Sequence, residues 1–241
     1  MRIPGFLLFL AALSAVTAET SQDDRKLQKN HVRKLSKSSS KSSFKKDTIT
    51  LKVTNLSWQQ PFGGVFVMTH DAHVDPLFTL GEEASEELAL LAENGSPGPL
   101  VDLYSGAHGV GTTFGFAEGA PFGGNVGANT FYIDIPYDSD YPYVSLATMA
   151  INTNDCFIAI NGRKLSPGDV FTGPGYDAGS EANNELCSSI PGPACPAGSG
   201  NNRSGGGEGF VHVHRGFFGV GDLSQAGYDW RNPMVRFEVM H

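Results

Sequence analysis

Long apolar segments are scarce in this chain of 241 residues. The clearest one lies near the N-terminus, from Phe6 to Val16, and it is shorter than the roughly 20 apolar residues that a membrane-spanning helix needs. No later segment is both long and apolar enough to cross a bilayer. We therefore expect a protein without a transmembrane segment.

Basic residues are few in most of the chain. Residues 47–241 contain 7 Lys and Arg against 22 Asp and Glu, a formal charge of −15, whereas the first 46 residues carry +7. An acidic surface repels the phosphates of nucleic acids and attracts cations. The charge distribution therefore predicts no nucleic acid partner and favours a cation as ligand.

Familiar catalytic motifs are also missing. The sequence has no G-x-S-x-G motif, which argues against a serine nucleophile of that type. It has no P-loop, and the glycines of GGNVGANTF lack the spacing of a dinucleotide-binding turn. Cys156 lies in the apolar run CFIAI without an evident activating partner, so we expect no thiol nucleophile. We predict a protein that is not an enzyme.

Cysteine is limited to three residues. Cys187 and Cys195 bracket the short segment SSIPGPA, and we expect them to form a disulfide in an oxidising compartment. Cys156 is expected to be buried as a small apolar side chain.

The N-terminus has the features of an export signal. Arg2 is followed by the apolar segment and by the small residues Val16-Thr17-Ala18, so we predict a signal peptide over residues 1–18 and secretion. Residues 19–46 are rich in Lys, Arg and Ser and poor in apolar residues, which predicts a disordered basic leader. Residues 47–241 suit one domain with a sizeable core.

Acceptor patterns for N-glycosylation accompany these signals. Asn55-Leu56-Ser57 and Asn202-Arg203-Ser204 fit the pattern, and the second lies in a more plausible surface loop. Asn94-Gly95-Ser96 also fits, but Pro97 follows it directly and makes it a poorer candidate. We predict an extracellular glycoprotein.

Short β-rich segments separated by Gly, Pro, Asn and Asp dominate the remaining chain. The predicted strands are 48–56, 64–70, 129–136, 143–151, 156–160, 209–214 and 234–240. Residues 82–95 predict the one clear helix, because Leu88, Leu91 and Ala92 share a face. Residues 98–106 are a shorter candidate. This pattern predicts an all-β fold, an antiparallel β-sandwich with a short helical insertion.

Two acidic loops are the first candidate site. NTNDC, residues 152–156, places Asp155 between two strands, and GYDAGSEANNE, residues 175–185, contains Asp177 and Glu181. Carboxylates and amide oxygens are the ligands that calcium prefers, usually about 6–8 at about 2.3–2.6 Å. The alternative from the residues alone is a solvated acidic turn.

Histidines form a rival candidate. In GFVHVH, residues 209–214, His212 and His214 point to the same side of a strand, because side chains alternate along it. Such a pair is a frequent half of a zinc or copper site, and His70 at the end of another strand is a possible third ligand. The alternative is that these histidines hydrogen-bond to neighbouring loops.

Several motifs occur together in a characteristic order: TNDCF, YDAGSE, IPGP and YDWRNPMVRFEV. This order resembles the spondin domain, the N-terminal module of F-spondin and mindin that also exists as a stand-alone secreted microbial form. The resemblance runs from about Thr48 to Val239. It implies a C2-like β-sandwich whose calcium is held by carboxylates of two loops.

The resemblance assigns these ligands residue by residue. The first-loop aspartate matches Asp155, and the second loop matches residues 176–181, which contain Asp177. Ser180 stands where the animal form has threonine, and Glu181 where it has aspartate. Both replacements keep the type of donor, so the resemblance implies an intact site of Asp155, Asp177 and Glu181.

The sequence thus predicts a secreted calcium-binding β-sandwich module that recognises a component of the extracellular matrix or cell surface. The alternative is an extracellular enzyme that uses zinc or copper held by His70, His212 and His214. A third possibility is that the basic leader is the functional part and the sandwich its carrier. Calcium as the bound metal would favour the module, and tightly bound zinc or copper the enzyme.

Overall fold

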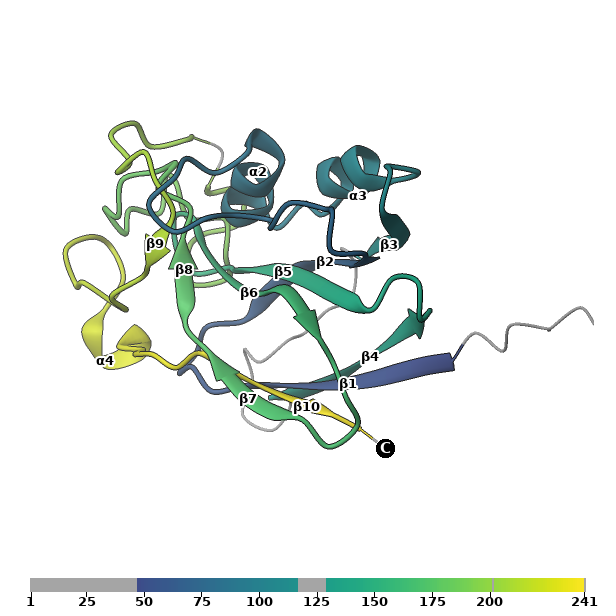
Figure 1. Ribbon diagram of the computed structural model, residues 1–241. Coiled ribbons are helices and arrows are strands. Elements are labelled where there is room, and N and C mark those ends of the chain that lie inside the picture. The colour runs from purple at the N-terminus through teal and green to yellow at the C-terminus, as the bar shows by residue number, and fades with distance from the viewer. Residues whose placement is uncertain (1–46, 117–128, 201, 241) are drawn as a thin grey trace, which may run out of the picture. The chain divides into compact units, whose positions relative to one another are not determined.

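The computed structural model describes residues 47–116, 129–200 and 202–240. Its strands form two antiparallel sheets that face each other (Figure 1). The four-stranded sheet has the order β4 (Thr130–Tyr137), β1 (Asp47–Asn55), β10 (Val235–Val239) and β7 (Val170–Gly173). The six-stranded sheet has the order β3 (Val110–Phe116), β2 (Phe62–His70), β5 (Tyr143–Ala150), β6 (Cys156–Lys164), β8 (Gly175–Asp177) and β9 (His212–Val213). The predicted β-sandwich is confirmed. The predicted signal peptide and basic leader lie outside the described residues.

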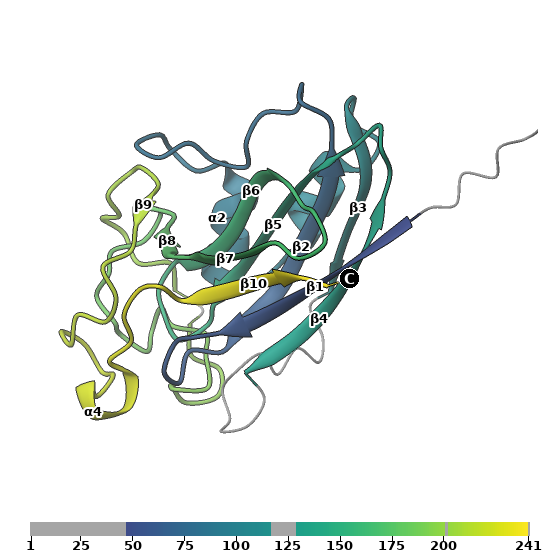
Figure 2. The ribbon, with the colours of Figure 1, turned by 60° about the horizontal axis from the view of Figure 1, so that its bottom comes forward.

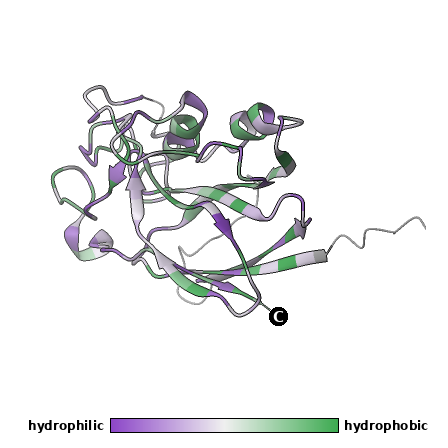
Figure 3. Ribbon diagram, in the orientation of Figure 1, coloured by the Kyte–Doolittle hydropathy of each residue, from purple (hydrophilic) through white to green (hydrophobic). Residues whose placement is uncertain are grey.

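The main core fills the space between the two sheets. On β1 hydrophobic residues alternate with hydrophilic ones, as the ribbon colours of Figure 3 show, and Leu51 and Val53 are fully buried. The neighbouring β10 alternates in the same way, with Val235 and Phe237 facing inward. Because one face of this sheet meets solvent, its strands keep the period of two that sequence analysis recognises.

Two short helices cover the outer face of the six-stranded sheet (Figure 1). These are α2 (Glu86–Asn94) and α3 (Gly98–Tyr104). Leu88 and Leu91 of α2 pack in one cluster with Phe66 of β2 and Phe157 of β6. Strand β2 is therefore covered on both faces, and every residue in it is buried. Among the described residues, no helix has the length and apolar character needed to span a bilayer.

Helix α2 begins and ends where its sequence predicts. The Ser85 hydroxyl caps the N-terminus by accepting a hydrogen bond from the Leu88 N–H, and Gly95 ends the helix in the left-handed conformation. The carbonyl of Gly95 lies so close to Gly64 of β2 that a Cβ at Gly64 would be 2.2 Å from its oxygen. Glycine at position 64 therefore lets the helix end rest on the sheet.

The loops gather at one end of the sandwich. Figure 2 shows the segments around β8 and β9 on the same side as the short helix α4 (Gln225–Tyr228). The predicted strand over residues 209–214 is reduced to His212–Val213, and the rest of that segment is loop. This end of the molecule carries both acidic loops.

Candidate metal centre

Strand pairing brings the two acidic loops together. The first residue of β6, Cys156, lies opposite Asp177 at the end of β8, so Asp155 and Asp177 are close neighbours. Asp177 in turn lies opposite His212 of β9. The loop before β6, the loop after β8 and the segment leading into β9 therefore meet at the same sheet edge.

Asp155 is fully buried and holds the second loop in place. Its Oδ2 accepts hydrogen bonds from the backbone N–H groups of Ser180 (2.8 Å) and Glu181 (2.9 Å), and from the Ser180 hydroxyl (3.1 Å). Its Oδ1 is buried and has no hydrogen-bond partner among the described residues. Burial, and then the charge of Asp177, raises the pKa of Asp155 to about 8.

Asp177, at the end of β8, is fully buried where the two acidic loops meet. Its Oδ1 accepts from the Gly179 N–H (2.8 Å) and its Oδ2 from the Asn183 side-chain amide (2.7 Å). The Nε2 atoms of His214 and His212 lie 3.8 and 3.9 Å from this Oδ2. Burial is the main cause that raises the pKa of Asp177 above its ordinary value.

Glu181 resembles Asp155 in that the two oxygens of its carboxylate differ in their contacts. Its Oε1 accepts from the Ser204 N–H (2.6 Å), whereas its buried Oε2 finds no partner in the described part of the chain. The Asn154 amide, which donates to Asn184 (3.1 Å), lies close enough to favour the ionised form of Glu181. Burial outweighs this effect and raises the pKa of Glu181 to about 7.

Arg203, whose positive charge acts on Glu181, forms its ion pairs with helix α2. Arg203 ion-pairs with Glu93 of α2 at 2.7 Å and lies 3.5 Å from Glu86 of the same helix. Glu93 is buried, so this pair fixes the loop around residue 203 to the helix. Arg203 therefore adds only a long-range attraction to Glu181, and Glu181 Oε2 still has no hydrogen-bond partner among the described residues.

Glu185, in the same acidic stretch, has a structural role. It adopts a positive φ of 53° and is buried. Its carboxylate accepts three backbone N–H groups, from Phe218 (2.6 Å), Gly219 (2.7 Å) and Val220 (2.9 Å). Both oxygens of Glu185 are thus satisfied by the protein itself, in contrast to those of Asp155 and Glu181.

The three candidate histidines differ in the hydrogen bonds of their ring nitrogens. His214 is buried, accepts the Gly216 N–H at Nδ1 (3.0 Å) and therefore donates from Nε2 to the Asn183 oxygen (3.0 Å). Burial lowers its pKa to about 3, so this ring is neutral. His212 differs, because its Nδ1 is buried without a hydrogen-bond partner within the described ranges.

His70 lies far from the other two histidines. Its ring contacts the Asp71 carbonyl (2.8 Å) and the Ser145 hydroxyl (3.0 Å), and burial lowers its pKa. It pairs with Tyr143 at the start of β5, whereas Asp155 follows the end of that strand. A strand of this length spans roughly 23 Å. The structure therefore does not assemble the predicted group of His70, His212 and His214, and His70 bonds to neighbouring groups instead.

A different set of side chains has its ligand atoms close together. Among the described residues, one group of three such side chains has atoms within 4.8 Å of one another: Asp177, Glu208 and His212. This group could hold a metal ion. Of the predicted calcium ligands it includes Asp177 but neither Asp155 nor Glu181. Glu208 was not predicted, and the signal for it was its place in the glycine-rich GGGEG just before the histidine pair.

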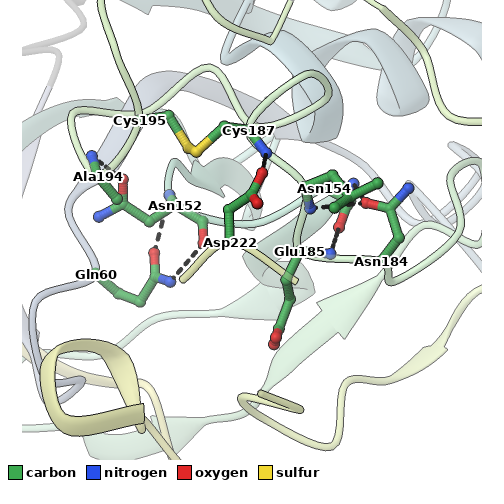
Figure 4. Close-up of a disulfide and its surroundings, with 10 residues drawn as sticks. Gln60, Asn152, Asn154, Asn184, Glu185, Cys187, Ala194, Cys195 and Asp222 are labelled. Atoms are coloured by element: carbon green, nitrogen blue, oxygen red, sulfur yellow. Dashed lines mark hydrogen bonds between the residues drawn. A yellow bond between two sulfur atoms is a disulfide. The ribbon is translucent and has the colours of Figure 1, made fainter. Parts of the chain in front are cut away.

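The predicted disulfide joins Cys187 and Cys195 and closes a loop whose Ala194 contacts Asn152, in the loop that precedes Asp155. Figure 4 shows Asn152 accepting the Ala194 N–H (3.0 Å) and bonding to Gln60 on its other side. The Cys187 N–H donates to Asp222 (2.9 Å). Cys156 is free and buried, as predicted.

Replacement of both disulfide cysteines by alanine is expected to lower the free energy of unfolding by about 2–3 kcal/mol, because the bond closes a loop of about nine residues in the unfolded chain. Urea denaturation measures this loss, with Ser188→Ala, an exposed change in the same loop, as control. Equal stability of the double variant and the control would contradict the expectation.

The glycosylation patterns differ in their accessibility. Asn55 is buried and its side-chain nitrogen donates to the Gln60 carbonyl (2.6 Å), so this acceptor is not accessible in the folded chain. Asn94 and Asn202 are exposed. Modification of Asn202 remains a prediction.

Neither the comparison with protein-family models nor the search of curated proteins finds a match for this chain.

Proposed function

We propose that this protein is a secreted, calcium-binding β-sandwich module whose ion ties the loops at one end of the sandwich together beside an extracellular recognition surface. The observation that carries this proposal is that two buried carboxylate oxygens, Asp155 Oδ1 and Glu181 Oε2, have no hydrogen-bond partner among the described residues and lie in the two loops that meet at Asp177.

Burial of uncompensated carboxylates is unfavourable. An ionised carboxylate loses its hydration when it is buried, and this cost persists unless hydrogen bonds, an opposite charge or a metal replaces the water. Both oxygens of Glu185 meet this requirement, whereas the three donors to Asp155 all reach Oδ2, and Asp155 Oδ1 and Glu181 Oε2 have no donor among the described residues. A bound cation would supply the missing compensation for both.

The donor set favours calcium. Asp155, Asp177 and Glu181 offer hard oxygen atoms, and calcium accepts irregular sets of such ligands together with carbonyls and water. With calcium–oxygen distances of about 2.4 Å, two ligand atoms lie at most about 4.8 Å apart. Among the described residues, Asp155 and Glu181 do not form a group with Asp177 in which all ligand atoms lie within this distance. We therefore expect calcium binding to draw Asp155 and Glu181 toward Asp177, or to recruit one of them through water.

The same loops expose apolar side chains that can contact a partner. Leu186, Phe210, Val213 and Val220 are 41, 41, 45 and 67 % exposed, and they lie on the segments that build the metal end. Apolar side chains grouped around an ion-stabilised end are suited to recognition of an extracellular partner. Secretion is supported by the signal-like N-terminus and by the disulfide, which persists in oxidising compartments.

A melting experiment on the full chain tests the calcium site. After removal of metals with EGTA, addition of calcium to about 100 times its dissociation constant is expected to stabilise the protein by about 2.7 kcal/mol, or roughly 5–10 °C. Asp155→Asn keeps an acceptor for the Ser180 and Glu181 N–H groups but removes the charge. This variant should fold and lose the calcium response.

Asp102→Asn is the matched control, because Asp102 is exposed on α3. It should respond to calcium as the original protein does. Magnesium at the same concentration should give a smaller shift. An equal response in both variants, or no response in the original protein after metal removal, would overturn the proposed calcium site.

A further inference from the structure

We propose that Asp177, Glu208 and His212 form a second metal site, selective for zinc, at the solvent-facing side of the same sheet edge. The site goes beyond the calcium proposal because it requires a nitrogen ligand, and the two share Asp177 alone. The ligand atoms of the three side chains already lie within 4.8 Å of one another.

Two of the ligands are fixed by backbone pairing. Asp177 and His212 are directly opposite each other on β8 and β9. Residues in this relation project to the same face of the sheet with Cβ atoms about 4.5–5.5 Å apart. Their ligand atoms, Asp177 Oδ2 and His212 Nε2, are 3.9 Å apart. The sheet therefore holds an oxygen and a nitrogen ligand side by side.

The observed spacing is close to that of a zinc site. Bonds of about 2.0–2.1 Å in a tetrahedral arrangement place ligand atoms roughly 3.3 Å apart. Closing the 3.9 Å separation therefore requires a shift of about half an ångström. Glu208 can adjust more widely, because it is exposed and lies among the glycines of residues 205–209.

A relay of hydrogen bonds positions the carboxylates. The neutral His214 donates to the Asn183 oxygen, which turns the Asn183 amide nitrogen toward both acids. That nitrogen donates to Asp177 Oδ2 (2.7 Å) and to Glu208 Oε1 (3.2 Å). Outer groups that orient metal ligands in this way raise the affinity of the site. His214 thus acts as a positioning residue rather than a ligand.

The ring of His212 is bonded differently from the rings of His70 and His214. Its Nδ1 has no hydrogen-bond partner in the part of the chain that the structure describes, and its Nε2 is beyond hydrogen-bonding distance of Asp177. His70 and His214, in contrast, use both ring nitrogens. A proton on Nδ1 would leave the Nε2 lone pair directed toward the two carboxylates.

The donor set identifies the class of metal. Imidazole is a ligand for zinc and other borderline divalent ions, while calcium takes oxygen ligands. One histidine and two carboxylates leave at least one of the four zinc positions to water or to a group from a partner. The site therefore differs from structural zinc sites, in which the protein supplies all four ligands, because it keeps an open position.

Zinc titration of the full, metal-free chain tests this site. We expect one zinc per chain by elemental analysis, and a visible absorption spectrum of four-coordinate cobalt when cobalt replaces zinc. His212→Gln is expected to weaken zinc binding by at least ~100-fold, more than the loss of an outer partner costs. Glu208→Gln should also weaken it, and this exposed change does not threaten the fold.

Controls separate this site from other histidines and from calcium. His108→Gln and Glu83→Gln change exposed residues of matching type elsewhere and should bind zinc normally. Asp155→Asn should keep zinc and lose the calcium response, whereas His212→Gln should do the reverse. Absence of zinc binding, or normal binding by both His212→Gln and Glu208→Gln, would overturn the zinc site and leave the calcium result unaffected.

Discussion

Without metal, the folded protein is expected to lose stability as the pH rises from 6.5 to 8. Burial raises the pKa of Asp155 to about 8 and that of Glu181 to about 7, far above the ordinary values of 3.8 and 4.5. In this range the unfolded chain has released both protons, whereas the metal-free folded chain still holds the proton on Asp155 and part of that on Glu181. The folded state binds more protons, so stability falls with rising pH.

The size of the fall follows from the same linkage. One proton bound in the folded state alone changes the free energy of unfolding by about 1.4 kcal/mol per pH unit. Asp155 therefore contributes roughly 2 kcal/mol at most between pH 6.5 and 8. Below pH 6.5 the effect is partly offset, because the lowered pKa of the buried His214, about 3, contributes a rise of stability with pH there.

Calcium should remove this pH dependence. A cation binds the ionised carboxylates and so competes with protons, which makes the stabilisation by calcium larger at pH 8 than at pH 6.5. Urea denaturation at several pH values, in EGTA and in calcium, measures both trends. Asp155→Asn should flatten the slope in EGTA, and Asp102→Asn should not. A metal-free protein whose stability is constant or rises from pH 6.5 to 8 would contradict the expectation.

Much of the fold could be predicted from local sequence patterns. Strands with one solvent-facing side, such as β1 and β10, show the alternation that identifies them, and α2 shows both its apolar face and its caps. Strand β3 was missed because Gly111 and Gly115 interrupt its pattern. At Gly115 a Cβ would lie 2.9 Å from Pro97, so the glycine serves the close approach of α3, which no local pattern reveals.

Strands β7 and β8 were missed for a different reason. Pro174 separates them and the chain changes sheets there, so each strand is only three or four residues long. Such short strands are defined by their partners, β10 and β6, rather than by their own residues. The residues of this segment therefore do not indicate, by themselves, which strands it pairs with.

The candidate site shows the same division between local and long-range information. Asp155 and Asp177 were identified from their own loops, and strand pairing places them together. The partnership of Asp177 with Glu208 and His212 depends on residues more than 30 positions away, which the spacing along the chain does not reveal. The grouping of His70 with His212 and His214 failed because residues at strand ends can lie at opposite ends of one sheet.

Replacement of Glu181 and of Glu185 by glutamine is expected to change the free energy of unfolding of the metal-free protein in opposite directions. Glu185 accepts three N–H groups, so Glu185→Gln replaces one acceptor oxygen by an N–H₂ group that faces backbone donors. Hydrogen bonds to a charged group contribute about 1.5–3 kcal/mol each, and a buried donor left without an acceptor costs about 1–3 kcal/mol. We expect Glu185→Gln to lower the free energy of unfolding by about 2–4 kcal/mol.

Glu181→Gln should instead stabilise the metal-free protein at pH 8. The glutamine oxygen can still accept the Ser204 N–H, while the change removes a buried charge whose second oxygen has no partner among the described residues. The raised pKa of Glu181, about 7, indicates a gain on the order of 1–3 kcal/mol at a pH where the carboxylate is ionised. The same variant should lose most of the stabilisation by calcium.

Denaturation of both variants in EGTA and in calcium distinguishes a ligand from a structural acceptor, with Glu83→Gln as the exposed control. A buried carboxylate ligand without its ion lowers the free energy of unfolding. Replacing it by a neutral side chain therefore stabilises the metal-free protein and abolishes the response to the ion. A structural acceptor shows the reverse, because its charge is already matched by donors and calcium binding does not involve it. If Glu181→Gln were as destabilising as Glu185→Gln and still responded to calcium, Glu181 would be a second structural acceptor, and the cation would have to bind without it.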